Sequence, residues 1–402
     1  MSFSIVLYDD CPARRGLLPL VATRPVSNLR VGVLTINEKW ELLFKREVSY
    51  ITIDYLRGKF SLQNNLSAAV LVIKGSVLPS DELLQAVRNL GVNQKLISPA
   101  GKEWIALMAP SIDHFSVDEL SHYTEIPFPH AVDQLCYPQD VFLLNSNQIE
   151  YDLRVMQFDN IKATLVDKNT FVGDNIYIEK NAKMQGVLLD SSKGPIYIGK
   201  NVLLETGVVI HGPAAIGDDC RLKTGAVIYA NVTVGPSSTI CGELTNVVIW
   251  GNAAKGHAGY LGCSVVGEGC NLGAGTTNSN LRNDWSMVKS YDYVKQGFRD
   301  TQLTKCGAII GDQAMLGIQS MLTTGTVIGV GAQVAMSKFI PKFVPDFSWL
   351  TDDKYDSYAF DRFIGMMQRK SKFKNENFTI DDELIYQYIY RHTRELRDNN
   401  QH

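Results

Sequence analysis

Several hallmarks of common protein classes are missing from this 402-residue sequence. None of its seven cysteines belongs to a C-x-x-C pair, which favours reduced, packed thiols in a cytoplasmic protein. The N-terminal residues MSFSIVLYDD have no basic region followed by a long apolar run, so we expect no signal peptide. No apolar stretch is long enough to cross a bilayer, so we expect no membrane span.

An excess of charge of either sign is also absent. With 39 Lys and Arg against 42 Asp and Glu, the formal net charge is −3. Bulk electrostatics therefore gives no reason to expect a nucleic acid or an anionic membrane as a partner. The composition is that of a soluble globular protein, and the length suggests two or three domains.

A strict period of six residues dominates the second half of the sequence. Aliphatic residues occupy every sixth position in one unbroken run, namely Ile198, Leu204, Ile210, Ile216, Leu222, Ile228, Val234 and Ile240. The same register returns at Val266 and Leu272, and again between Ile310 and Val334. This period fits neither an α-helix nor a simple strand, and a repeat of this kind fixes the fold.

The hexads predict a left-handed parallel β-helix, which is a triangular prism of stacked coils. Each hexad is one short strand and one corner, and three hexads complete a coil. The aliphatic residue points inward, the small residue two positions earlier packs beside it, and Gly or Asn turns the corner where positive φ is needed. A β-sandwich is the alternative, but sandwich strands do not hold one register over so many repeats.

Residues 1–125 predict a smaller nucleotidyltransferase-like α/β domain. We expect strands at about 3–8, 50–53, 68–74 and 104–108, and helices at about 37–46 and 80–90, which together suggest a doubly wound sheet. The loop after the first strand is where such sheets bind ligands. Arg14, Arg15 and Arg24 are its candidate nucleotide or phosphate ligands, although they can equally cap helices or pair with acids.

The remaining segments divide as follows. Residues 126–160 predict a linker and a helix from about 139, which we expect to dock the α/β domain onto the first coil. The β-helix is expected over 161–340, with interruptions at 244–261 and 281–306 that should be loops, the second reaching a neighbouring subunit. Residues 341–402 predict an extended segment and two helices, at about 355–372 and 380–397, packed on the open end of the prism or against a partner.

The residues with the clearest chemistry lie where the hexads break. Residues 255–262 read KGHAGYLG and residues 271–280 read NLGAGTTNSN. Acyl transfer from a thioester needs a deprotonated acceptor, and His257 is the natural base at neutral pH. Glu243 can orient this histidine or bind a sugar, and N–H groups in the glycine-rich corner 272–275 can hold an oxyanion. A zinc site of three histidines is not indicated, because only His211 and His257 lie in the prism.

These segments resemble a bifunctional family that makes UDP-N-acetylglucosamine. Its members join a glucosamine-1-phosphate N-acetyltransferase to an N-acetylglucosamine-1-phosphate uridylyltransferase. The resemblance covers residues 200–336 well; residues 1–100 resemble sugar-nucleotide pyrophosphorylases only faintly, with LLPL and TRP present but the G-x-G loop missing. It implies acetyl-CoA as cofactor, a small sugar phosphate as substrate, a homotrimer with sites between subunits, and Mg²⁺ only if the N-terminal domain is active.

The resemblance also implies roles for individual residues. His257 takes the place of the catalytic base, and no metal ligand is implied. The substrate-binding positions are Lys223, Glu243, Tyr260, Asn271 and Asn280, and the positions near acetyl-CoA are Ala274 and Gly275.

Four departures from the family pattern leave the acceptor open. Thr245 replaces a phosphate-binding Lys, Leu281 replaces a Tyr, and Ile318 and Met336 replace small residues. Since histidine serves an amino or a hydroxyl acceptor equally, N- and O-acetylation both remain. Two other functions also remain: sugar-1-phosphate nucleotidyl transfer from UTP or dTTP by the N-terminal domain, and a non-catalytic sugar-nucleotide-binding scaffold.

Overall fold

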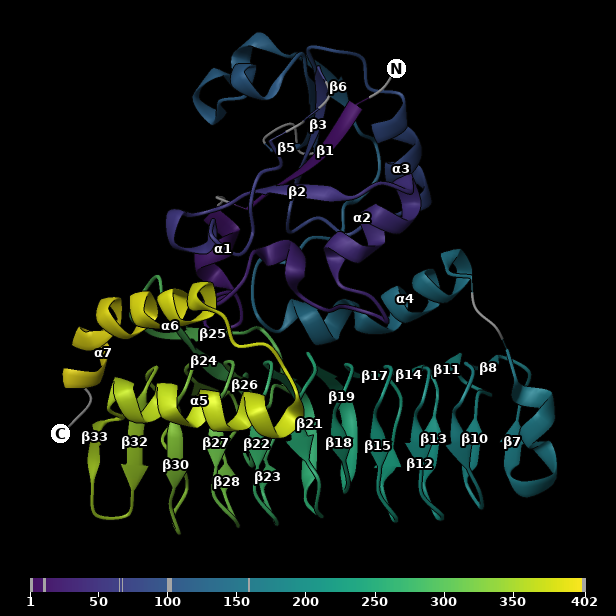
Figure 1. Ribbon diagram of the computed structural model, residues 1–402, viewed down its shortest axis with the longest axis vertical. Helices are drawn as coiled ribbons and strands as arrows, with labels where there is room; N and C mark the ends of the chain where they lie inside the picture. Colours follow the sequence, from purple (N-terminus) through teal and green to yellow (C-terminus); the bar gives the residue numbers. More distant parts are fainter. Residues whose placement is uncertain are drawn as a thin grey trace. The chain divides into compact units, whose positions relative to one another are not determined.

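The computed structural model describes residues 3–9, 12–64, 66, 68–99, 103–157 and 160–399 (Figure 1). The chain forms two compact units. The first comprises Met1–Leu17, Arg24–Leu29 and Leu34–Tyr137; the second comprises Leu18–Thr23, Arg30–Val33 and Pro138–His402. Two short pieces of the N-terminal region therefore belong to the same unit as the hexads.

The first unit is built on a 6-stranded sheet in the order β2-β1-β3-β5-β4-β6. The strands are β1 (Phe3–Tyr8), β2 (Val48–Ile51), β3 (Ala69–Lys74), β4 (Gln94–Ile97), β5 (Trp104–Ala109) and β6 (Thr124–Pro127). The helices are α1 (Pro12–Gly16), α2 (Ile36–Phe44) and α3 (Asp81–Arg88). As predicted, Ser80 caps α3, since its hydroxyl accepts a hydrogen bond of 3.1 Å from the backbone N–H of Leu83.

The sheet is mixed, which corrects the expectation of a doubly wound one. β1 pairs in parallel with β2 and β3, but β5 runs antiparallel to both β3 and β4. Only six residues separate β4 from β5, too few for the crossover that parallel neighbours need. β4 and β6 were not predicted, because both are short and β6 is mostly exposed.

The second unit is a parallel β-helix whose strands form three faces. Face A contains β7 (Thr170–Val172), β10 (Leu188–Asp190), β13 (Val209–His211), β16 (Val227–Ile228), the first halves of β19 (Glu243–Ile249) and β21 (Tyr260–Val266), β23 (Thr277–Asn278) and β28 (Met321–Leu322). Face B contains β8 (Ile176–Ile178), β11 (Ile196–Ile198), β14 (Ala214–Ile216), β17 (Val232–Val234), the second halves of β19 and β21, β26 (Ile309–Ile310), β29 (Val327–Ile328) and β31 (Phe343–Val344).

Face C completes each coil. It contains β9 (Lys183–Met184), β12 (Leu203–Leu204), β15 (Arg221–Leu222), β18 (Thr239–Ile240), β20 (Ala254–Lys255), β22 (Asn271–Leu272), β27 (Met315–Leu316), β30 (Gln333–Ala335) and β32 (Ser348–Thr351), with β33 (Tyr355–Ser357) added antiparallel at the end. We name the corners by their contents: the motif corner joins face C to face A, the pocket corner joins A to B, and the helix corner joins B to C.

The hexad aliphatics point inward, as predicted. Every member of the run from Ile198 to Ile240 is at most 1% exposed, and all belong to one continuous core with the small residues beside them. The glycines after the aliphatics have another reason than the one expected. Gly217 and Gly311 do not adopt positive φ; a Cβ on either would approach a backbone nitrogen of the next coil to 2.9 Å. Positive φ falls instead on other corner residues, such as Asn201, Asp219 and Gly225.

Coil length explains where the register shifts. Val209 pairs with Val227, 18 residues later, but Leu188 pairs with Val209 over 21 residues. Around the motif the coils are short, since Val232 pairs with Val247 and then Val247 with Ser264. The expectation of a loop at 244–261 is therefore wrong: this segment continues the prism as β19, β20 and β21, with residues removed from the corners.

The second interruption is an arm, as predicted. It folds as an antiparallel hairpin of β24 (Lys289–Asp292) and β25 (Gly297–Asp300). Four large apolar side chains of the arm are exposed, namely Trp285, Met287, Val294 and Phe298. Whether the arm contacts a neighbouring subunit stays a prediction.

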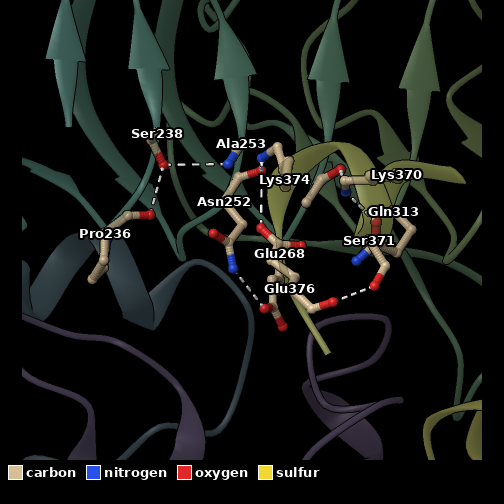
Figure 2. A network of polar contacts seen from close by, with 11 residues as sticks. Pro236, Ser238, Asn252, Ala253, Glu268, Gln313, Lys370, Ser371, Lys374 and Glu376 are labelled. Atoms are coloured by element: carbon tan, nitrogen blue, oxygen red, sulfur yellow. Dashed lines mark hydrogen bonds and ion pairs between the residues drawn. The ribbon is translucent and has the colours of Figure 1, made fainter. Parts of the chain in front are cut away.

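Helices cover parts of the β-helix in places that were not predicted. α4 (Asp140–Val155) contacts the middle coils rather than the first one, since Asn145 donates to Asn231 over 3.1 Å and accepts from Thr233 over 3.0 Å. α5 (Phe360–Lys374) lies along the helix corner rather than on the open end of the prism (Figures 1 and 2). α6 (Ile380–His392) and α7 (Arg394–Asp398) follow it.

Candidate functional site

His257 stands exposed on the motif corner, immediately after β20. Within the described part of the chain, its imidazole makes no hydrogen bond or ion pair, which leaves both ring nitrogens open to a ligand. The backbone beneath it is held from inside. Lys255 is 1% exposed, and its ammonium donates to the carbonyl oxygens of His257, at 2.5 Å, and of Cys241, at 3.4 Å. The lysine thus connects two successive coils under the histidine.

Burial changes the proton affinity of this lysine. Desolvation lowers the pKa of Lys255 from its ordinary value to about 8. A second lysine supports the same corner, because the ammonium of Lys223 donates to the carbonyl oxygen of Gly256 over 2.9 Å. The predicted substrate residue Lys223 therefore lies one backbone unit from His257, with one of its protons already engaged.

Tyr260 and Asn280 form a polar pair at the other end of the same strand. The amide of Asn280 donates to the Tyr260 hydroxyl over 3.0 Å and to the Cys263 sulfur over 3.4 Å. Burial raises the pKa of the Tyr260 hydroxyl, which stays a neutral donor near pH 7. The ring lies along the strand towards Gly262, where a Cβ would come within 2.2 Å of the hydroxyl oxygen. Only glycine fits at 262, so the backbone makes room for Tyr260.

Asn278 locks this end of the strand in place. Its side chain is 5% exposed and pairs with both backbone groups of Gly262, accepting from N–H over 2.8 Å and donating to C=O over 3.0 Å. Such an amide pair imitates a strand neighbour where face A gives way to the arm. Sequence reasoning did not select Asn278 or Lys255, although both stand inside the quoted motifs. Their role depends on burial, which the motif alone does not reveal.

The other predicted substrate residues lie on the surface around these groups. Glu243 is exposed and sits beside Tyr260 in the face A ladder, and among the described residues its carboxylate makes no bond to His257. Asn271 is exposed on face C, opposite Ala254 in the ladder. The structure therefore brings Glu243 to Tyr260, and leaves Asn271 at the start of the next motif corner.

The glycine-rich corner after β22 does not offer the donors that were expected of it. The N–H of Gly273 donates to Leu316 over 2.9 Å, and the N–H of Gly275 donates to Ala258 over 3.2 Å. Both groups are used in joining coils, so an oxyanion hole made by these two N–H groups is wrong. What fits an extended thioester chain here is the small size of Ala274 and Gly275, which are partly exposed. Gly275 adopts φ 76°, a conformation that favours glycine.

The arginines of the N-terminal loop have different surroundings. Arg14 is buried and its guanidinium pairs with the carboxylate of Asp9 over 2.7 Å and with the carbonyl of Arg24 over 3.0 Å. Arg24 is 4% exposed, whereas Arg15 is exposed on α1. Of the three predicted phosphate ligands, only Arg15 presents an accessible guanidinium in this structure. Phosphate binding by any of them stays a prediction.

Two further properties bear on the kind of site. In the part of the chain that the structure describes, no three His, Cys, Asp or Glu side chains gather as a metal site. None of the helices described is both long enough and apolar enough to cross a membrane.

Comparison with known proteins agrees with both halves of the chain. Residues 5–160 match the sugar nucleotidyl transferase family, and residues 195–230 match the bacterial transferase hexapeptide, six repeats. The bifunctional protein GlmU of Methanococcus vannielii is 35% identical over 113 residues, which are 27% of this chain and 26% of that protein. The chain thus aligns with about a quarter of the length of such relatives.

A second relative is covered much more fully. The uncharacterized acetyltransferase YaiX of Escherichia coli is 34% identical over 177 residues, which are 42% of this chain and 76% of that protein. Among solved structures, the UDP-N-acetylglucosamine acyltransferase of Francisella novicida is similar with a TM-score of 0.33 and 13% identity, over 57% of this chain and 87% of that one.

The stacked hexads with a loop histidine define a hexapeptide-repeat transferase. More particularly, the chain belongs to the acetyltransferase family of YaiX, with a sugar nucleotidyltransferase-like domain before the β-helix.

Proposed function

We propose that the chain is an acetyl-CoA-dependent N-acetyltransferase of the cytoplasm that acts on a sugar phosphate, with glucosamine-1-phosphate as the first candidate, and that it works as a homotrimer. The observation that carries the proposal is the motif corner itself. An exposed imidazole stands on a loop whose carbonyls are fixed by a buried lysine, one short strand away from the Tyr260–Asn280 pair. The family supports acetyl transfer, and the match to GlmU relatives supports a sugar substrate.

Each group has a task in this reaction. One nitrogen of the His257 imidazole takes a proton from the acceptor amine, whose nitrogen then forms a bond to the thioester carbonyl carbon. The carbon–sulfur bond breaks, and the sulfur leaves as the thiol once it is protonated. Tyr260 and Asn280 present a hydroxyl and an amide to the sugar, and Lys223 supplies positive charge for its phosphate. Asn271, Ala274 and Gly275 border the path of the coenzyme, and Glu243 contacts the sugar beside Tyr260.

Replacement of the histidine tests the proposal. His257→Ala should reduce thiol release from acetyl-CoA with glucosamine-1-phosphate by about 10²–10⁴-fold, the usual contribution of a general base. Release is followed with a thiol reagent, and the oligomer by sedimentation, which should not change because the imidazole is exposed. His122→Ala, an exposed histidine of the first unit, is the control. Unchanged turnover of the His257 variant would exclude this assignment.

A second candidate function rests on the match of residues 5–160 to the sugar nucleotidyl transferase family. If the first unit is active, UTP and N-acetylglucosamine-1-phosphate with Mg²⁺ should release pyrophosphate. Arg15→Ala should lower this rate at least about tenfold, as expected when one ionic contact to a phosphate is lost. Arg369→Ala, exposed on α5, should not. No pyrophosphate from UTP or dTTP would leave the first unit as a binding domain, and no coenzyme A binding would favour a non-catalytic scaffold.

A further inference from the structure

A pocket of about 350 Å³ opens on the pocket corner, several coils away from His257. Its lining includes Asp190, Lys193, His211, Tyr229 and Thr245. None of these residues has a task in the acetyl transfer proposed above. The whole pocket is made by the β-helix unit, so it does not depend on the position of the first unit.

Two features of the chain create this hollow. The coil that starts at β10 is longer than those after it, because residues 191–195 form an enlarged corner that places Lys193 on its rim. Along the corner, outward side chains then shrink from one coil to the next. His211 and Tyr229 are followed by Thr245, and then by Gly262, which carries none. The aromatic rings therefore end in a step that exposes Tyr229.

The polar groups in the pocket are arranged in a definite way. The carboxylate of Asp190 lies 3.4 Å from Nδ1 of His211, which favours a proton on that nitrogen and leaves Nε2 as an acceptor. The rings of His211 and Tyr229 are parallel within 10°, with centroids 5.6 Å apart, so the imidazole is fixed from two sides. Lys193 is exposed and forms no ion pair with the residues that the structure describes. The pocket thus offers an aromatic face, a hydrogen-bond acceptor and a free cation.

We propose that this pocket is a second small-molecule site, which binds a sugar that carries an anionic group. An aromatic ring covers the apolar face of a sugar, while a carboxylate and an imidazole accept hydrogen bonds from its hydroxyls. Lys193 pairs with the anionic substituent at the rim. The three groups come from three successive coils, spaced about 4.8 Å apart, which matches the width of one hexose ring.

Binding of N-acetylglucosamine-1-phosphate to the full chain, measured by calorimetry without coenzyme A, tests the site. Tyr229→Ala, Lys193→Met and the pocket-filling Thr245→Trp should each weaken binding about tenfold or more. The matched controls, Tyr137→Ala and Lys200→Met, remove an equally exposed tyrosine and lysine elsewhere and should leave affinity within about twofold. Asn280→Ala should remove binding at the Tyr260–Asn280 pair only.

The outcomes separate this proposal from the proposed function. If wild-type protein shows no saturable binding, or if only Asn280→Ala lowers it, the pocket site is wrong. If the pocket variants weaken binding while wild-type protein releases no thiol with glucosamine-1-phosphate, the pocket stands and the acetyltransferase proposal falls. The three pocket variants differ in chemistry, so a folding defect in one leaves two to decide, and thermal melting identifies such a defect.

Discussion

The motif corner and the helix corner solve one problem with the same residue type, a lysine drawn in from water. At the motif corner Lys255 donates to the carbonyls of Cys241 and His257. At the helix corner Lys370 of α5 donates to the carbonyl of Gly269 over 2.6 Å and to the side chain of Gln313 over 2.5 Å (Figure 2). Desolvation lowers the pKa of both lysines.

The two corners differ in what the lysine leaves exposed. Around Lys370 the corner is closed by further bonds, from Lys374 to the Asn252 carbonyl over 2.8 Å and from Asn252 to Glu268 over 3.1 Å (Figure 2). Around Lys255 no helix covers the loop, and the imidazole of His257 faces solvent. A buried lysine thus attaches a helix at one corner and supports an open, ordered loop at the other. Openness combined with order is what a binding loop requires.

The largest effect is expected from the lysine of the motif corner. Lys255→Met leaves two buried carbonyls unpaired, which should lower the free energy of unfolding by about 1–3 kcal/mol. Because His257 loses its support, thiol release should fall by about 10²-fold as well. Thermal melting and the thiol assay measure these two effects, with Lys200→Met as the exposed control.

The pH dependence of the same variant adds a second readout. The folded-state pKa of Lys255, about 8, lies below that of an exposed lysine, so its contribution to stability is present at high pH and is lost as pH falls through 8. Wild-type protein should therefore gain stability from pH 8 to 10 relative to Lys255→Met. A stability loss with normal turnover would show that the two corners do not differ in function.

A smaller and purely structural effect is expected at the helix corner. Lys370→Met removes two hydrogen bonds that attach α5, which should lower the unfolding free energy by about 1–2 kcal/mol without changing turnover. Lys372→Met, exposed on the same helix, should have no measurable effect. Loss of turnover in Lys370→Met would mean that α5 influences the site, contrary to the comparison.

The smallest effect should come from a buried acid near the end of the helix corner. Asp346 accepts a hydrogen bond of 2.6 Å from Val330, and burial raises the pKa of its carboxyl to about 6. A raised pKa means that its contribution to stability is complete below pH 4 and is lost as pH rises through 6. Asp346→Asn should remove this dependence, a difference on the order of 1 kcal/mol between pH 4 and 7 in melting experiments. Parallel pH profiles would show that Asp346 is ionised in both states.

The sequence predicted the prism well because inward hexad positions form a direct record of the core. It failed at 244–261, where shortened corners mimic an insertion: the residues still pair coil to coil, but every sixth position no longer points inward. The sheet of the first unit was mistaken for a parallel one, because apolar runs such as β3 and β5 look alike in either direction.

The candidate site was predictable only in part. His257, Tyr260 and Asn280 follow from the motif, and the bond between the last two confirms that the structure brings them together. Lys255, Asn278 and the Asp190–His211 pair were not found. Their partners are main-chain groups or residues more than a coil away, and their meaning depends on which side chains the fold buries.

The uneven coil lengths set limits on how such a protein can be rearranged. Where each coil has 18 residues, as between Val209 and Val227, a whole coil can be added or removed and its neighbours still meet matching partners. From Val227 to Asn271 the spacing changes at each turn, so a transplanted coil would place its corners out of step. Gene fragments exchanged between relatives should therefore preserve this segment as one inherited block.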